Sequence, residues 1–256
     1  MVVADLHVHT TNSDGSLTRE TLPEAAEAAG VSAVAVTDHD RLHPELPTPV
    51  ATIDGVTVVH GIELRVEAGE HRIDLLGYGA RRTPALESLI DRLQTDRKER
   101  GREIIERVED RLGVETPVEP RAGLGRPHIA EAIAAVSEYS YAGAFEELIG
   151  AGGPCYVPRE IPSFEDGLGV LEDACGLVSL AHPYRYDDPA AALSLCSDLD
   201  AVERFYPYDR EIDPRPIERA IERHDLLVTG GSDAHGETLG EAGLDRRAYR
   251  TFRAAF

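Results

Sequence analysis

Two histidines separated by a single residue, His7 and His9, occur in a short segment near the start of the chain, just after Asp5. Their alternation with Leu6 and Val8 predicts a β-strand, and the two-residue period of a strand places both imidazoles on one face. Imidazoles presented on one side of a rigid element are a suitable beginning for a metal site. Taken alone, the pair is also compatible with two structural or exposed histidines, so the rest of the chain must decide.

Similar polar residues follow one predicted strand after another. Asp233 and His235 repeat the spacing of the first pair, and Asp14 lies in the loop after the first strand. In a parallel barrel the carboxyl ends of the strands converge on one rim, where active sites are built. Mixed imidazole and carboxylate ligands suit Mn²⁺, Zn²⁺ or Fe²⁺, and many of them suit two or three ions sharing carboxylates. The residues at these positions are His7, His9, His39, Glu63, Asp74, His182, Asp233 and His235.

The elements that must position these residues alternate between strand and helix. A helix over residues 18–29 ends at Gly30, a residue typical of a helix C-terminus. Alternation of this kind predicts an α/β fold with a largely parallel sheet and crossover helices. The predicted strands cover residues 2–8, 31–37, 56–64, 72–78, 176–181, 200–205 and 226–229.

Between residues 84 and 153 the pattern becomes wholly helical. Apolar residues keep a helical period through a strongly charged stretch, and segments 129–136 and 142–149 fit two shorter helices. The charged run 96–111 is interpreted as a solvated helix with ion pairs four residues apart. We therefore expect a helical lobe, residues 84–153, inserted into an α/β core of residues 1–83 and 154–256.

Composition limits the class of protein. With 256 residues, 42% of them hydrophobic, the chain can bury a sizeable core. No apolar run approaches the length of a membrane span, so no membrane association is expected. The three cysteines, Cys155, Cys175 and Cys196, form no C-x-x-C pair. Free thiols and a cytoplasmic location are therefore expected.

The charge balance is strongly acidic. The net charge is -21, from 47 acidic against 26 basic residues, and Lys98 is the only lysine. Poverty in lysine together with many carboxylates is typical of adaptation to high salt, so we expect a halophilic protein. An extended nucleic-acid-binding surface is not expected on such a chain. An anionic substrate must instead be bound by metal ions or by a few local arginines.

The segments DLHVHT, TDHD, GIE, AHP and GSDAH, in this order, resemble the signature of the PHP (polymerase and histidinol phosphatase) domain family. The resemblance spans nearly the whole chain. Residues 125–130, GRPHIA, and 181–186, AHPYRY, are similar to segments of the TrpH-like metal-dependent phosphoesterase branch. The resemblance implies a distorted (β/α)₇ TIM-like barrel, with the helical lobe inserted as a substrate cap.

The resemblance also implies an activity and cofactors. The expected enzyme hydrolyses phosphate monoesters of nucleotides, such as AMP-like nucleotides, nucleoside 3′,5′-bisphosphates or oligonucleotide 5′ ends. A metal-bridged hydroxide is the expected nucleophile. Two to three divalent ions are expected, with Mn²⁺ favoured and Zn²⁺, Fe²⁺ or Mg²⁺ as alternatives. The partner is a small phosphorylated molecule.

The metal ligands implied by the resemblance include one departure from the branch, which usually has a histidine where this chain has Asp74. His71, three residues earlier, would lie on the opposite face of a strand. Asp74 is therefore predicted as the ligand and His71 is predicted to face solvent. A carboxylate is a harder ligand and shifts the preference from Zn²⁺ toward Mn²⁺ or Mg²⁺. The predicted ligands are His7, His9, Asp14, His39, Glu63, Asp74, His182, Asp233 and His235.

The catalytic and substrate-binding residues implied by the resemblance are Arg126, His128 and Arg185. The two arginines would hold the equatorial phosphoryl oxygens. Arg159 is either a further phosphate contact or a surface residue. A third metal ion, or a protonated histidine such as His128 or His182, would serve the leaving oxygen; the sequence does not choose between them.

Several other polar residues receive supporting roles. Asp38 and Asp40, which flank His39, fit an orienting or capping role better than direct ligation. Glu203 and Tyr206, after another predicted strand, could line the pocket. His43, His60 and His224 match no motif and are expected to be structural or exposed.

Two other functions stay open. Histidinol-phosphate phosphatase would use the same metal ligands, but the RPH segment at residues 126–128 argues against it. A non-catalytic, metal-stabilised PHP module serving a partner would be expected to have lost ligands, whereas only one is altered here. The sequence shows neither a Ser or Cys nucleophile with its base nor a Gly-rich phosphate loop.

Overall fold

The computed structural model describes residues 1–255. The chain divides into two compact units, one formed by Met1–Ser88 together with the chain from Ile161 onward, the other by Leu89–Glu160. The second unit begins and ends a few residues later than the lobe expected from the sequence. At the start, the long helix α2 (Pro84–Leu112) runs uninterrupted from one unit into the other. At the end, Cys155 and Val157 pack in the core of the second unit.

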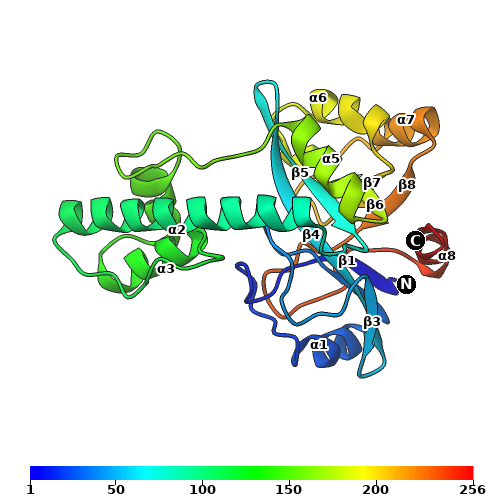
Figure 1. Ribbon diagram of the computed structural model, residues 1–256, viewed down its shortest axis with the longest axis horizontal. Helices are drawn as coiled ribbons and strands as arrows, with labels where there is room; N and C mark the ends of the chain where they lie inside the picture. The colour runs from blue at the N-terminus through cyan, green and yellow to red at the C-terminus, as the bar shows by residue number, and fades with distance from the viewer. Residues whose placement is uncertain (256) are drawn as a thin grey trace. The chain divides into compact units, whose positions relative to one another are not determined.

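The first unit is built around an eight-stranded sheet (Figure 1). Its neighbouring strands follow the order β1-β2-β4-β5-β6-β7-β8, and β3 pairs with β4 outside this path. Strands β1, β2 and β6 are buried along their whole length. In β2 this burial explains the wholly apolar sequence AVAV. The strands are β1 (Ala4–Val8), β2 (Ala33–Val36), β3 (Val50–Ile53), β4 (Val56–Ala68), β5 (His71–Tyr78), β6 (Leu177–Leu180), β7 (Ala201–Phe205) and β8 (Leu227–Gly230).

The middle of the sheet departs from the largely parallel arrangement that the sequence predicted. The pairs β1–β2, β2–β4, β6–β7 and β7–β8 are parallel. The pairs β3–β4, β4–β5 and β5–β6 are antiparallel. Only Gly69 and Glu70 separate β4 from β5, so the chain must turn back as a hairpin and has no room for a crossover helix.

The α/β class is confirmed, but the sheet curls without closing fully into a barrel. Within residues 1–255, β8 has no regular ladder to β1. An isolated bridge between Val8 and Ala234 joins the two edges instead. The segment after β8 thus lies directly beside the end of β1.

Helices of the first unit pack against the strands of the sheet. Helix α5 contacts β4 and β6, α7 contacts β7, and α8 contacts β8 (Figure 1). Helix α1 ends at Gly30, which has a left-handed φ of 69°. The helices are α1 (Leu22–Ala29), α5 (Phe164–Ala174), α6 (Pro189–Ser194), α7 (Arg215–His224) and α8 (Arg246–Arg253), with the short 3₁₀ turns η2 (Pro183–Arg185) and η3 (Leu195–Asp198).

The second unit is helical. After α2 it contains α3 (Arg126–Val136), α4 (Tyr141–Ala144) and the π-helical turn η1 (Phe145–Ile149). Its core includes Ile104 and Val108 of α2 and Ile129 and Ile133 of α3. The charged run 96–111 is therefore not a wholly solvated face. Among residues 1–255, no helix has both the length and the apolar character needed to cross a bilayer.

Candidate metal centre

The nine predicted metal ligands converge at the ends of strands far apart in the sequence. Some lie within strands or just after them, as His7 and His9 do at the end of β1, and others in the loops that follow β2, β6 and β8. Their ligand atoms form three overlapping groups, each with all atoms within 4.8 Å of one another. The groups are His9, Asp14, His39 and His235; His7, His9, Glu63 and Asp233; and Glu63, Asp74 and His182.

The backbone near several of these residues has unusual φ angles or an unusually close contact. His182 and Asp233, directly after strands, have positive φ angles of 26° and 51°. Such conformations cost energy and concentrate at functional sites. A Cβ on Gly231 would lie 2.3 Å from the backbone nitrogen of His7. Only glycine therefore allows the segment after β8 to approach β1 closely enough to bring Asp233 to the histidines.

The carboxylate of Glu63 lies at the centre of the cluster. Its Oε2 lies 2.8 Å from His39 Nδ1 and 3.4 Å from His9 Nε2. Its Oε1 lies 3.0 Å from His182 Nε2 and 3.5 Å from His7 Nε2. Burial raises the pKa of Glu63, but His39 and His7 outweigh burial and hold that pKa well below its usual range. One buried carboxylate thus joins four rings from the ends of β1, β2 and β6.

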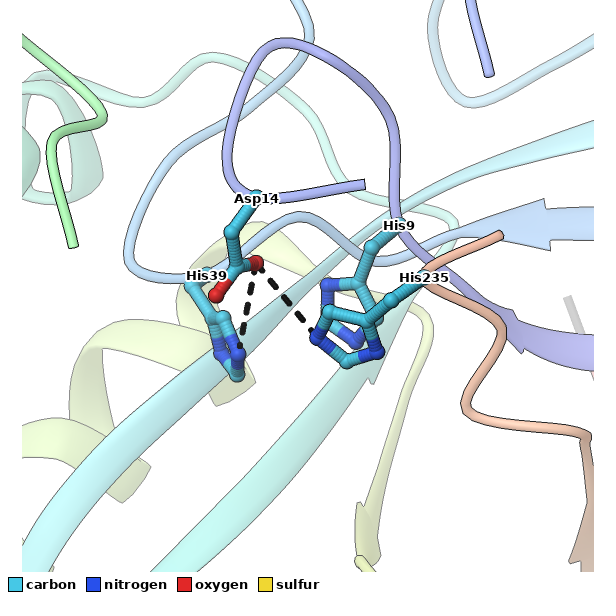
Figure 2. Close-up of side chains that lie close together, drawn as sticks. All are labelled: His9, Asp14, His39 and His235. Atoms are coloured by element: carbon cyan, nitrogen blue, oxygen red, sulfur yellow. Dashed lines mark ion pairs between the residues drawn. The ribbon is translucent and has the colours of Figure 1, made fainter. Parts of the chain in front are cut away.

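The first group surrounds Asp14 (Figure 2). Asp14 Oδ1 lies 3.7 Å from His39 Nε2 and 3.5 Å from His235 Nε2, and the rings of His9 and His235 stack with centroids 4.2 Å apart. Burial raises the pKa of Asp14, but the neighbouring His39 and His235 lower it further than burial raises it. The carboxylate is therefore ionised and suited to bind a cation.

The donor atoms fit a divalent metal. His7 Nε2, His9 Nδ1 and Asp14 Oδ1 are buried and make no hydrogen bond within residues 1–255. Buried polar atoms without partners are rare and call for an unseen water or ion. Imidazole nitrogens and carboxylate oxygens are the ligands that Mn²⁺, Fe²⁺ and Zn²⁺ accept. The residues of the first two groups can therefore hold two ions, with His9 at the junction.

A second set of carboxylates orients the first. Glu203, fully buried in β7, lies 3.1 Å from His7 Nδ1 and accepts the backbone N–H of His182 at 2.7 Å. A hydrogen bond from Nδ1 leaves His7 Nε2 available to the cluster. The sequence suggested only that Glu203 lines a pocket. The sequence pattern shows which face of β7 carries Glu203, but it does not show that His7 lies opposite.

Asp38 has the supporting role expected of it. Its carboxylate accepts hydrogen bonds from Thr10 N at 2.8 Å, Asn12 Nδ2 at 3.0 Å and Ser13 Oγ at 2.8 Å. These bonds fix the loop that carries Asp14. Asp40 accepts the backbone N–H of Arg65 at 3.3 Å.

Asp74 has a partner that the sequence did not indicate. It is buried in β5, while His71 is exposed, as their spacing predicted. Both oxygens of Asp74 accept hydrogen bonds from the guanidinium of Arg65, a residue of β4. Asp74 Oδ2 also lies 3.8 Å from His182 Nε2. Asp74 thus belongs to the cluster, but a cation of the protein already binds it.

Arg185 lies beside the cluster and lines a cavity of about 530 Å³. Its Nη1 donates to Asp233 Oδ2 at 2.7 Å and to the hydroxyl of Tyr206 at 3.1 Å. Tyr206 in turn donates to Asp233 Oδ2 at 3.0 Å. Tyr208 and His235 also line this cavity. The cavity therefore opens next to two of the predicted ligands and has an aromatic wall.

The histidines outside the motifs lie apart from the three groups. His43 and His60 are buried, and His224 is half-buried at the end of α7. Burial lowers the pKa of His60 to about 4, and the charges of Arg82 and His43 lower it too. His60 is thus a neutral core residue, in keeping with the structural role predicted.

The second unit contains a cluster of arginines. The guanidinium of Arg126 lies over the rings of Phe145 and Tyr156, at 5.7 and 5.9 Å from their centroids. His128 Nδ1 accepts the backbone N–H of Gly125 at 3.1 Å and so caps α3. The predicted residues of this unit therefore lie at the start of α3.

Arg100 of α2 also belongs to this cluster, although the sequence interpretation placed it on a solvated helix. It is buried, and its Nε donates to the carbonyl of Val157 at 2.9 Å. Burial lowers its pKa to about 10, and the charges of Arg126, Arg159 and Arg97 contribute. The only indication in the sequence was that Arg97 and Arg100 are three residues apart, which places both on the same face of α2.

Comparison with known proteins identifies relatives along the whole chain. Residues 5–150 match the family described as PHP domain. The chain is 32% identical to phosphoribosyl 1,2-cyclic phosphate 1,2-diphosphodiesterase of Eggerthella lenta, over 92% of this chain and 95% of that protein. It is 28% identical to 3′,5′-nucleoside bisphosphate phosphatase of Chromobacterium violaceum, over 96% of this chain and 90% of the relative.

A solved structure agrees with the fold. The structure assigned to a metal-dependent phosphoesterase of Bifidobacterium adolescentis superposes with a TM-score of 0.80 and 25% identity. The match covers 98% of this chain and 96% of the other. The similarity thus includes the curled sheet as well as the helical insertion.

The contact between Glu203 and His7 generates a prediction about metal affinity. Glu203→Ala should weaken Mn²⁺ binding by about 10- to 100-fold, because His7 loses the carboxylate that orients its ring. Glu203→Gln should have a smaller effect, since an amide oxygen can still accept from Nδ1. Titration of the metal-free protein with Mn²⁺ measures both. Glu218→Ala is the control, because Glu218 is half-exposed and pairs with Arg204. Equal affinity of Glu203→Ala and wild type would contradict the assignment.

Proposed function

The chain belongs to the PHP domain family and is a metal-dependent phosphoesterase, and from this premise we propose that it hydrolyses phosphate monoesters of nucleotides. The substrates proposed are AMP-like nucleotides, nucleoside 3′,5′-bisphosphates or oligonucleotide 5′ ends. The observation that carries the proposal is the pair of overlapping ligand groups that meet at His9, next to a cavity with an aromatic wall.

The proposed ion sites use seven of the nine predicted ligands. His7, Glu63 and Asp233 would hold one ion, and Asp14, His39 and His235 the other. His9 belongs to both groups, and its neutral imidazole would bind one of the two ions. His182, 3.0 Å from Glu63, supports the shared carboxylate. When bound, divalent ions of this kind, with Mn²⁺ favoured, supply a hydroxide nucleophile at neutral pH and neutralise phosphoryl charge.

The protein's own residues orient the substrate. The guanidinium of Arg185 is fixed by Asp233 and Tyr206 and is half-exposed, so it can bind phosphoryl oxygens beside the ligand groups. Charge that develops on those oxygens during the reaction is stabilised by a cation already in position. Tyr206 holds Asp233 from the other side and is a positioning residue.

The cavity beside the cluster suits the nucleoside part of the substrate. Its volume of about 530 Å³ lies within the usual range for small-molecule pockets. The rings of Tyr206 and Tyr208 form its aromatic wall, with centroids 4.7 Å apart. Aromatic side chains stack on the face of any nucleobase, so this wall would bind nucleotides without selecting one base.

The arginine cluster of the second unit suits a phosphate. Arg97, Arg100, Arg126 and Arg159 concentrate positive charge in a chain whose net charge is -21. Their mutual repulsion would be relieved by an anion, and guanidinium groups bind phosphate in bidentate fashion. We assign this cluster to a phosphate of the substrate and propose that residues 84–153 act as the substrate cap.

The first prediction on function concerns metal removal. Protein stripped by chelator should release no phosphate from AMP, a nucleoside 3′,5′-bisphosphate or a 5′-phosphorylated oligonucleotide, and addition of Mn²⁺ should restore activity. Histidinol phosphate and a cyclic phosphodiester belong in the same screen, because they test the alternative phosphatase and the chemistry of the Eggerthella relative. Full activity after verified metal removal would refute the proposal, and inactivity on every ester would favour the non-catalytic module.

The second prediction concerns the arginine cluster. Arg126→Ala should lower kcat/KM by about 10- to 100-fold, as expected for one charge-assisted hydrogen bond to phosphate, and should leave bound Mn²⁺ unchanged. Arg121→Ala is the matched control, since Arg121 is an exposed arginine of the same unit. His128→Ala tests the neighbouring residue. If both Arg126→Ala and His128→Ala behave like wild type, these residues serve only to build the start of α3.

The third prediction concerns the aromatic wall. Tyr208→Leu should raise KM for nucleotides by roughly 5- to 100-fold, the equivalent of one lost stacking contact. KM for a small ester without a base, such as glycerol phosphate, should not change. Tyr208→Phe keeps the ring and should behave like wild type. An equal rise in KM for both kinds of ester would show that Tyr208 does not bind the base.

A further inference from the structure

The hairpin of β4 and β5 places Arg65 directly opposite Asp74. The two residues are partners in the antiparallel register. Arg65 Nε donates to Asp74 Oδ1 at 2.7 Å, and Arg65 Nη2 donates to Asp74 Oδ2 at 2.6 Å. This is the bidentate arrangement in which a guanidinium and a carboxylate bind most strongly. Both oxygens of Asp74 are therefore engaged.

The pair is built into the structure rather than resting on the surface. The side chain of Asp74 is 2% exposed, and that of Arg65 is 39% exposed. The hydroxyl of Tyr186 accepts the backbone N–H of Asp74 at 2.8 Å and donates to the carbonyl of Ala181 at 3.1 Å. Tyr186 thus fixes Asp74 relative to the end of β6, where His182 begins its turn. Asp40 accepts the backbone N–H of Arg65 at 3.3 Å.

This arrangement competes with a metal ion in the third ligand group. That group consists of Glu63, Asp74 and His182. The Asp74 oxygen facing His182 Nε2, at 3.8 Å, is Oδ2, which Arg65 Nη2 already binds. A divalent ion there would have to displace the guanidinium or lie against another cation. In the second group Arg185 engages only Oδ2 of Asp233 and leaves Oδ1 facing His7 and His9. In the third group the guanidinium of Arg65 engages both oxygens of Asp74.

The charge of Arg65 is permanent. A guanidinium is not deprotonated in proteins, and two hydrogen bonds to Asp74 hold this one in place. Arg65 is covalently part of the chain, whereas a bound metal ion can dissociate into the solvent. The third cation of the cluster would therefore be present whether or not the protein is loaded with metal.

We propose that Arg65 takes the place of a third metal ion, so that this chain binds two divalent ions and uses a guanidinium for the third positive charge. Asp74 is then the anchor of Arg65 and not a metal ligand, in contrast to the role predicted from the sequence. Glu63 and Arg65 are two residues apart on β4, so their side chains leave the same face of the strand, and the charge of Arg65 would also act on a phosphate bound at the two ions. The inference rests on the proposed function in so far as the first two groups bind metal.

The test is a count of bound metal. Each protein is saturated with Mn²⁺, freed of unbound ion by gel filtration, and analysed for manganese per chain. Wild type and Asp74→Asn should both hold two equivalents. Arg65→Met, which keeps an apolar stem without the charge, should hold three, and Arg65→Met combined with Asp74→Asn should return to two. Arg72→Met is the matched control on the same hairpin, where Arg72 pairs with the exposed Glu67, and it should hold two.

The outcomes separate this inference from the proposed function. Three equivalents in wild type that fall to two in Asp74→Asn would overturn the inference and leave the metal-dependent function intact. Two equivalents in a folded Arg65→Met would also overturn it, because the guanidinium would then not be what excludes the ion. If Arg65→Met does not fold, wild type and Asp74→Asn decide between two and three equivalents. Wild type without any bound manganese would contradict the proposed function itself.

Discussion

The site depends on the contacts between the buried carboxylate of Glu63 and the histidines around it. Four histidine rings, those of His7, His9, His39 and His182, lie within 3.5 Å of its two oxygens, and they come from the ends of three strands, β1, β2 and β6. A buried carboxylate is costly unless positive groups or ions compensate it. The imidazoles around Glu63 hold its pKa low and so keep the carboxylate ionised. The buried nitrogens of His7 and His9 and the Asp14 oxygen that have no hydrogen-bond partner in the described residues are the atoms left to bind cations.

The rest of the first unit maintains that concentration. The positive φ angles of His182 and Asp233, and the contact that Gly231 permits with β1, bring later segments to the first strand. Asp38 and Glu203 form a further layer of carboxylates whose hydrogen bonds are directed at the loop of Asp14 and the ring of His7. Ligands held in this way lose little freedom when an ion binds, which favours tight and specific binding.

The same sheet that carries the ligands also contains its own cation. The antiparallel hairpin of β4 and β5 interrupts the parallel order, and it is this hairpin that sets Arg65 against Asp74. In the second unit, arginines are again gathered where most of the chain is acidic, with Arg100 buried among them. Local positive charge in a chain of net charge -21 confines the attraction for an anion to a few places. Both features suit a small phosphorylated substrate better than an extended polyanion.

Much of the site was predictable from local sequence. The two-residue period around His7, the repeat of that spacing at Asp233 and His235, and the polar residues at strand ends all follow from geometry within single elements. The same reasoning gave the α/β class and the helical insertion, because hydrophobic periodicity is a local property. The opposite exposure of His71 and Asp74 was predictable for this reason as well.

What the sequence by itself determined was therefore which side chains are presented on which face of each element, and the kind of ion they would bind. Only the tertiary structure decided which of them meet. The pairing of Arg65 with Asp74, the orientation of His7 by Glu203, and the burial of Arg100 all depend on neighbours supplied by other elements. Strand direction and helix packing are chosen by the summed burial of the whole chain. No period within one segment can encode a partner that lies across a hairpin, as Asp74 does, or more than a hundred residues away, as Glu203 does.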